Sequence, residues 1–335
     1  MSANSKITGS RAASAPDHRP SPLRLADVAL ACLSRLLFAD NQVAPVGAEQ
    51  LYLYHRCQPL RSIPDLAAAL QQTLAQPHPG DVPLATLSQQ LGLSAIEVVS
   101  LVMALLVEED PMVGRVLAQV QAPIGGSRPV LGMIEAALTP WQGEGWLCGR
   151  LLSGAALNCG VLQLVNTMAP LPEQGLKMPL GLALVLRGLP LVWPGTTTLS
   201  PQEQIKLPAS QQQMAARQAE ALGQSRHGVL VIRGGSRGET RSAAATVAAC
   251  LHRQLLLIDP LATELAGLGP ACLLGGYLPV FDYEQGLLEA PKLPHLAGYE
   301  GPCLALVGPD GQVRCDQGSL LQWTLLPPAR AERME

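Results

Sequence analysis

The residues best suited to chemistry lie between two apolar segments, 229–232 and 255–258, in the stretch RGGSRGETRSAAA. A glycine-rich turn between a buried strand and a helix is typical of the phosphate-binding loop GxxxxGK[ST], whose backbone amides and lysine hold nucleotide phosphates. The residues that could still form such a loop are Gly234, Gly235, Ser236, Gly238 and Thr240. If this loop were competent, its ligand would be ATP with magnesium.

Two defining positions of the motif hold other residues. Glu239 stands at the lysine position and Arg233 at the first glycine. The lost charge-assisted bond to phosphate is worth about 1.5–3 kcal/mol. A carboxylate roughly 5 Å from a phosphate adds about 3 kcal/mol of repulsion at an effective dielectric of about 20. Arg237 or Arg241 could supply a cation, but a guanidinium beside the loop does not replace a lysine beneath it. We therefore expect no bound cofactor.

A second candidate group follows the apolar run 278–281. Asp282 is placed where an acid at the end of a strand would hold magnesium. The neighbouring catalytic carboxylate is replaced by Tyr283, and Pro279 argues against a regular central strand. Two interpretations stay open: Asp282 is a residual metal ligand, or it is a surface acid that follows an edge strand.

A parallel sheet must position these residues. Strand 229–232, helix 243–251 and strand 255–258 predict a βαβ unit. The segment 302–311 predicts a further strand and turn. Residues 206–335 are therefore expected to form an α/β, P-loop-like parallel sheet domain with a degenerate nucleotide site.

The N-terminal half is predicted to be mainly helical. Apolar residues at helical spacing predict helices within 23–38, 63–76, 84–121 and 128–138. Ser94 and Glu97 can form a capping box for helix 95–107. A helix, tight turn and helix of this kind occur in winged-helix domains, so 23–140 is predicted to be winged-helix-like. Because helix 95–107 carries no Lys or Arg, we interpret it as a buried structural helix rather than a DNA-reading one.

The remaining segments carry weaker signals. Residues 1–22, rich in Ser, Ala and Pro, predict a disordered tail without the apolar centre of a signal peptide. Residues 141–205 are predicted to form a connecting α+β region. Within it, 178–193 is apolar but contains Arg187 and Pro190, so it is predicted to be buried core rather than a membrane span.

Composition excludes some partners. Of 335 residues 48% are hydrophobic, which predicts a packed chain, and the net charge of -3 gives no electrostatic case for binding nucleic acid or an anionic membrane. The eight cysteines are scattered, which favours reduced thiols acting as small hydrophobes and a cytoplasmic location.

The stretch LGLSAIEVVSLVMALLVEEDPMVGRVLAQVQ, residues 91–121, resembles part of the AAA+ ATPases that are encoded with extracellular contractile injection systems. The order that follows is also similar: a helix, a phosphate-loop unit and a strand ending in LLPPARAER. The resemblance implies a ring-forming ATPase that serves assembly, cargo loading or recycling of the injection apparatus. Gly238 and Thr240 match the family's phosphate loop and Asp282 its magnesium-holding acid, whereas Glu239 and Tyr283 do not match.

Three hypotheses follow from these patterns. The first is a pseudo-ATPase that has lost hydrolysis, because the sequence also ends before the family's lid, arginine fingers and second sensor. Such a protein would act as an adaptor or assembly factor through protein partners, with oligomer formation possible. The second is a conditionally active AAA+ ATPase whose site a partner subunit completes. The third is a winged-helix DNA-binding regulator.

Overall fold

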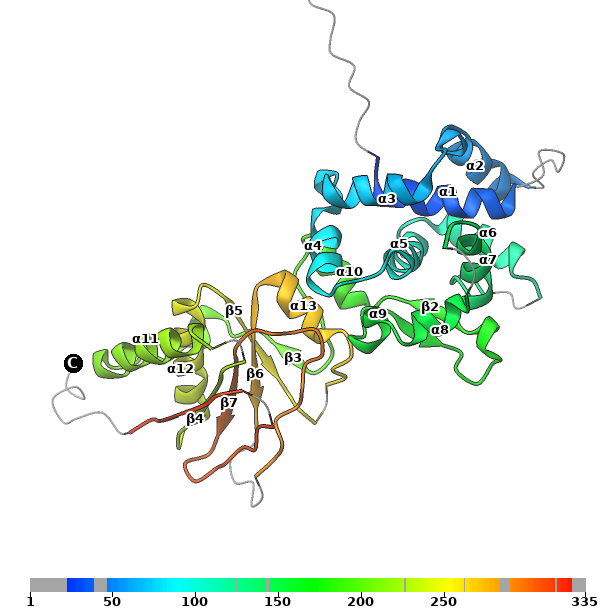
Figure 1. The fold of residues 1–335 in the computed structure, drawn as a ribbon. Helices are drawn as coiled ribbons and strands as arrows, with labels where there is room; N and C mark the ends of the chain where they lie inside the picture. The colour runs from blue at the N-terminus through cyan, green and yellow to red at the C-terminus, as the bar shows by residue number, and fades with distance from the viewer. Residues whose placement is uncertain are drawn as a thin grey trace, which may run out of the picture.

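The computed structural model describes residues 23–38, 47–123, 126–142, 145–225, 227–261, 263–283, 290–316 and 318–326. It has a helical N-terminal part and an α/β C-terminal part. They meet through α4 (Val82–Gln90), α10 (Leu180–Leu186) and α13 (Leu268–Gly275) (Figure 1). The predicted tail, residues 1–22, lies outside the described residues. None of the helices within the described ranges is both long and apolar enough to cross a membrane.

The helical part is built around one buried helix. Its elements are α1 (Leu25–Leu37), α2 (Ala48–Cys57), α3 (Leu66–Ala75), α4 (Val82–Gln90), α5 (Ala95–Glu109), α6 (Pro111–Val120) and α7 (Leu131–Gln142). The four predicted helical regions are confirmed. Helix α2 was not predicted, because only Leu53 and Cys57 of its residues are buried and its apolar period is weak.

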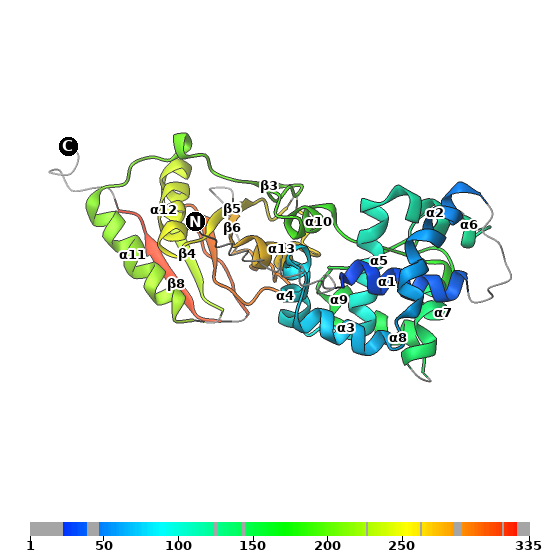
Figure 2. The same ribbon diagram turned by 90° about the horizontal axis from the view of Figure 1, so that it is seen from above.

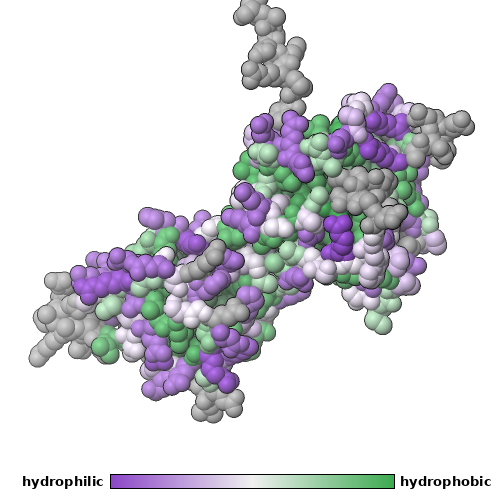
Figure 3. All heavy atoms as spheres, in the orientation of Figure 1, coloured by the Kyte–Doolittle hydropathy of each residue, from purple (hydrophilic) through white to green (hydrophobic). Residues whose placement is uncertain are grey.

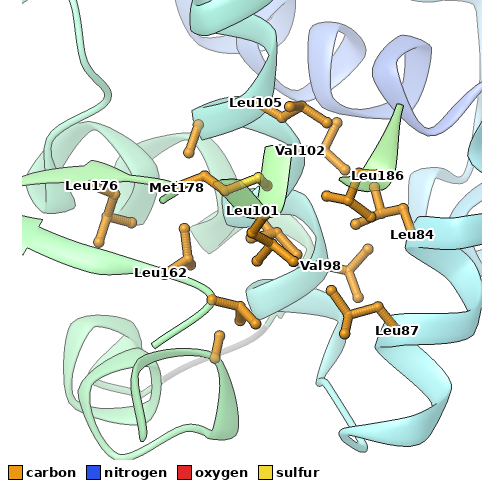
Figure 4. Close-up of a cluster of buried hydrophobic side chains, with 14 of the residues drawn as sticks. Leu84, Leu87, Val98, Leu101, Val102, Leu105, Leu162, Leu176, Met178 and Leu186 are labelled. Carbon is orange, nitrogen blue, oxygen red and sulfur yellow. The ribbon is translucent and has the colours of Figure 1, made fainter. Parts of the chain in front are cut away.

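Helix α5 is buried on nearly all sides, from Ile96 to Leu106. The predicted capping box is confirmed: Ser94 and Glu97 bond each other's backbone N–H groups. Figure 4 shows apolar side chains of α5 surrounded by those of α4, of α10 and of residues in and next to the hairpin of β1 (Gln163–Val165) and β2 (Gly175–Lys177). The labelled residues are Leu84, Leu87, Val98, Leu101, Val102, Leu105, Leu162, Leu176, Met178 and Leu186. A helix enclosed in this way has no face left for a DNA groove.

The segment after α7 joins the core of the helical part. It comprises α8 (Leu147–Leu152), α9 (Ala155–Asn158), the hairpin β1 (Gln163–Val165) and β2 (Gly175–Lys177), and α10 (Leu180–Leu186). Leu151, Leu162 and Leu182 are fully buried in the same cluster as α5. The prediction of buried core for 178–193 was wrong in part, because Leu180, Leu189 and Val192 are exposed.

The C-terminal part is a six-stranded sheet in the order β3-β5-β6-β7-β4-β8. The strands are β3 (Thr196–Thr197), β4 (Val229–Arg233), β5 (Gln254–Ile258), β6 (Tyr277–Asp282), β7 (Cys303–Val307) and β8 (Leu320–Thr324). All neighbours are parallel except the pair β3 and β5. The predicted α/β domain with a parallel sheet is therefore confirmed at this level.

Successive side chains of each strand point to opposite faces of the sheet, and different helices cover the two faces. Leu230 and Ile232 face a cluster formed with α11 (Ala209–Gly223) and α12 (Arg237–Cys250), whereas Val229 and Val231 face the other side. On that side α13 (Leu268–Gly275) packs against the sheet (Figure 2). Figure 3 shows the exposed side of α11 as hydrophilic, as its Gln-rich sequence requires.

The expectation that Pro279 excludes a regular central strand was wrong. Strand β6 lies between β5 and β7, and Pro279 pairs in register with Leu256 of β5. In a parallel ladder the backbone N–H groups of alternate residues point to opposite neighbours, and Tyr283 N–H donates to Leu306 O of β7. Continuing that ladder backwards, an N–H at position 279 would donate to Pro302 O. The Tyr299 hydroxyl donates to Pro302 O instead, at 3.0 Å, so the missing donor leaves no unpaired carbonyl.

Two glycines bring the helical part and the sheet part into backbone contact. Gly267 N–H, just before α13, donates to Cys159 O at 3.1 Å. Both Gly160 and Gly267 have positive φ, at 73° and 90°. A Cβ on Gly160 would overlap the backbone nitrogen of Gly267. This junction therefore requires glycine both for its conformation and for its space.

Gly160→Ala is expected to lower the free energy of unfolding by about 2–4 kcal/mol, from left-handed strain of about 1–2 kcal/mol together with a backbone clash. Gly276→Ala is a matched control, because Gly276 has φ of 66° but open space where its Cβ would stand. Urea denaturation should show a loss at Gly160 at least about 1 kcal/mol greater than at Gly276. Equal losses would mean that the backbone at Gly160 and Gly267 relieves the overlap without cost.

Candidate functional site

The turn between β4 and α12 is too short to be a phosphate loop. Strand β4 ends at Arg233 and α12 begins at Arg237, so only Gly234, Gly235 and Ser236 lie between them. Ser236 is the N-cap of α12, and its Oγ accepts a hydrogen bond from Glu239 N–H at 3.5 Å. In the motif, the residues between the first and last glycine provide amides that surround the phosphates. Here the strand and the helix have taken up several of those positions.

Thr240 is turned into the protein. It is 2% exposed, and its hydroxyl donates to Arg237 O at 3.1 Å within the first turns of α12. A Cβ on Gly234 would lie 2.7 Å from the Thr240 methyl carbon. Gly234 and Thr240 are thus brought together by packing. The Thr240 hydroxyl is not presented to a metal ion or phosphate.

Gly238 is covered by a residue that sequence reasoning did not single out. A Cβ on Gly238 would lie 2.7 Å from the terminal carbon of Ile205. The backbone N–H of Ile205 donates to Ser242 Oγ at 2.8 Å, which holds this segment against α12. The chain before α11 therefore crosses the N-terminal turns of α12. No local pattern around Ile205 predicts this, since the contact depends on the path of a non-helical segment.

Asp282 is an ion-pair partner at the end of β6. Its side chain is 5% exposed, and its Oδ2 accepts from Arg237 Nε at 3.1 Å and from Arg241 Nε at 2.9 Å. The terminal nitrogens of the two arginines lie 3.0 and 2.6 Å from the same oxygen. The interpretation of Asp282 as a surface acid after an edge strand was wrong, because β6 is central and the carboxylate is buried.

The pairing depends on positions that the sequence does contain. Arg237 and Arg241 are four residues apart and so lie on one face of α12. The carboxyl end of β6 lies at the same edge of the sheet as the start of α12, since β4 and β6 both pair in parallel with β7. Once the strand order is known, both guanidinium groups are within reach of Asp282.

Two groups near this ion pair, Tyr283 and Glu203, have shifted pKa values. Burial raises the pKa of Tyr283 to about 12, so its phenol is neutral at physiological pH. Asp282 Oδ1 and the Tyr283 hydroxyl are buried and make no hydrogen bond with the described residues. The pKa of Glu203 is lowered mainly by hydrogen bonds from Ser200, with a smaller effect of the Arg241 charge.

The residues present do not fit a magnesium nucleotide. The Thr240 hydroxyl bonds its own helix, Asp282 Oδ2 is held by two cations, and Glu239 occupies the lysine position. A divalent ion at Asp282 Oδ1 would lie beside both guanidinium groups and be repelled by them. Within the described ranges, no three His, Cys, Asp or Glu side chains are grouped as metal ligands.

A cavity of about 150 Å³ lies at the opposite ends of the strands, where Val229 and Cys303 begin β4 and β7. The charged groups on its wall, Lys292 and Asp316, pair with each other. Burial raises the pKa of Cys303 to about 12, so its thiol stays protonated and is a poor nucleophile. The Cys303 thiol is therefore not a candidate nucleophile in this cavity.

No protein-family model, no curated protein and no solved structure matches this chain.

Proposed function

We propose that this chain is a non-hydrolysing AAA+-like protein that acts through protein contacts, as an adaptor or an assembly or loading factor of a contractile injection system. The observation that carries the loss of hydrolysis is the pairing of Asp282 with Arg237 and Arg241. The link to injection systems rests on the resemblance of residues 91–121. The free thiols of all eight cysteines favour action in the cytoplasm.

The ion pair gives a physical reason for the loss of nucleotide. A negative charge near the N-terminus of a helix is stabilised by the helix dipole, and phosphate commonly provides it. In this chain Glu239 stands in the first turn of α12, and the Asp282 carboxylate neutralises the two arginines of that helix. A nucleotide would have to displace a buried carboxylate from two guanidinium groups before it gained the same interactions.

The two alternative functions would require larger changes to the structure. An ATPase completed by a partner subunit would need Ile205 to leave Gly238 and the turn at 234–236 to lengthen at the expense of β4 or α12. A DNA-binding regulator would need an accessible recognition helix. Helix α5, the helix considered for that role, is buried from Ile96 to Leu106.

Isothermal titration calorimetry with ATP and magnesium is expected to show no saturable binding to the full chain. Glu239→Lys alone should not restore binding or turnover, because the short turn and the cover over Gly238 remain. Binding at micromolar concentration, or turnover that Thr240→Ala abolishes, would replace this proposal with the conditionally active ATPase. Retention on duplex DNA at physiological salt would instead support the DNA-binding regulator.

A further inference from the structure

Strand β8 is an edge of the sheet whose outer side has no partner strand among the described residues. Within the part of the chain that the structure describes, it pairs with β4 alone, in parallel, over the five residues Leu320–Thr324. Figure 2 shows β8 with α11 at the end of the molecule away from the helical part. The other edge strand, β3, is only two residues long.

The ladder with β4 shows which backbone groups of β8 are unpaired. Val229 N–H donates to Ser319 O at 2.9 Å. Leu325 N–H donates to Arg233 O at 2.8 Å. The odd-numbered residues of β8 therefore direct their backbone groups toward β4. The residues that direct N–H and C=O outward are Leu320, Gln322 and Thr324.

This edge lacks the features that prevent strands from adding to it. Natural edge strands are shielded by charged side chains, especially lysine, by proline, by bulges or by shortness. The stretch SLLQWTLL, residues 319–326, contains no charge and no proline. A regular, uncharged edge of this length is suited to pairing with another strand.

We propose that the chain forms a two-fold symmetric homodimer in which β8 pairs antiparallel with β8 of a second copy. With the two-fold axis at Gln322, this residue pairs with its own copy, and Leu320 of each chain pairs with Thr324 of the other. This register uses the outward N–H and C=O groups of all three residues, whereas a shifted register leaves one residue unpaired. Both sheets then continue as one.

Helix α11 favours a second copy over an isolated peptide strand. Gln211 Nε2 donates to Leu326 O at 3.0 Å, and Ser225 Oγ lies 2.8 Å from Ser319 Oγ. The helix therefore runs antiparallel along β8. By helical spacing, Met214, Gln218 and Ala221 lie on the same flank of α11 as Gln211 and Ser225, and the exposed Arg217 lies next to them.

A two-fold axis perpendicular to the sheet brings the two α11 helices side by side and antiparallel. The flanks that meet are mostly uncharged, with Arg217 at their margin, and antiparallel helix dipoles attract weakly. A single peptide strand would use the edge of β8 but leave these flanks exposed. A second copy covers both the edge of β8 and the flank of α11. Each is covered by the same residues of the other chain, as an isologous interface requires.

Two double variants test the register. Leu320→Lys with Thr324→Lys places like charges directly opposite each other at both ends of the paired strands. Leu320→Lys with Thr324→Glu makes the same number of charges but places opposite charges across the interface. Sedimentation velocity of the full chain at about 10–100 µM should show a dimer for the unchanged protein.

The dimer dissociation constant should rise about tenfold or more in the Lys/Lys variant relative to the Lys/Glu variant. Circular dichroism and thermal unfolding of both variants at low concentration control for folding, since positions 320 and 324 are exposed and face away from α11. A monomer for the unchanged protein at the highest concentration would overturn the proposal. Equal dissociation constants for the two variants would overturn it too, because dimers would then form elsewhere.

Discussion

Replacing both Arg237 and Arg241 with alanine should lower the free energy of unfolding by about 3–5 kcal/mol, the cost of removing the partners of a buried charge. The reason is the buried side chain of Asp282, which is only 5% exposed and has no other hydrogen-bond partner among the described residues. The arginines are 50% and 31% exposed, so they could reach water if the aspartate were removed. The aspartate cannot do the same.

The matched control is Asp282→Asn in the background of the double arginine variant. The amide of asparagine is uncharged, so it does not leave a buried charge without a partner. This third change should therefore recover more than half of the lost stability. Urea denaturation of the three proteins measures both effects. If the asparagine variant is no more stable than the double arginine variant, the loss came from packing of the arginine stems rather than from the charge of Asp282.

Glu97→Ala should lower the free energy of unfolding by about 2–4 kcal/mol. Each hydrogen bond to a charged group contributes about 1.5–3 kcal/mol, and the total loss is smaller than the sum because water takes over some of the donors that Glu97 leaves. The carboxylate is 4% exposed. Its Oε2 accepts from both Ser94 N–H and the Ser94 hydroxyl at 2.7 Å, and its Oε1 accepts from Ala156 N–H at 2.8 Å. One side chain thus caps α5 and holds the start of α9.

Ser94→Ala is the comparison that separates the two roles of Glu97. It removes the hydroxyl that caps α5 and donates to Glu97 but leaves the bond from Ala156 N–H, and it should cost about 1 kcal/mol, the usual value for an N-cap serine. Thermal unfolding followed by circular dichroism would give both values. If the two variants lose the same stability, the bond from Glu97 to Ala156 does not contribute, and the capping box alone explains the effect.

Much of the secondary structure could be predicted because its signals are local. The capping box at Ser94 and Glu97, the apolar period of α5 and the glycine-rich turn after β4 can all be read from neighbouring residues. The loss of the lysine at Glu239 was equally visible. Helix α2 and the β1–β2 hairpin were missed, since short elements with few buried residues lack a clear period.

The sequence by itself determined that the C-terminal part is a parallel α/β sheet and that its loop lacks a phosphate-binding lysine, because both depend on residue types a few positions apart. Only the tertiary structure decided how the loop is used. Asp282 meets Arg237 and Arg241 because β6 and β4 lie on either side of β7. Ile205 covers Gly238 because a distant segment crosses α12, and Pro279 is tolerated because the Tyr299 hydroxyl replaces its missing donor. These contacts join residues that are far apart in the chain, and their energies depend on distances that no local pattern encodes.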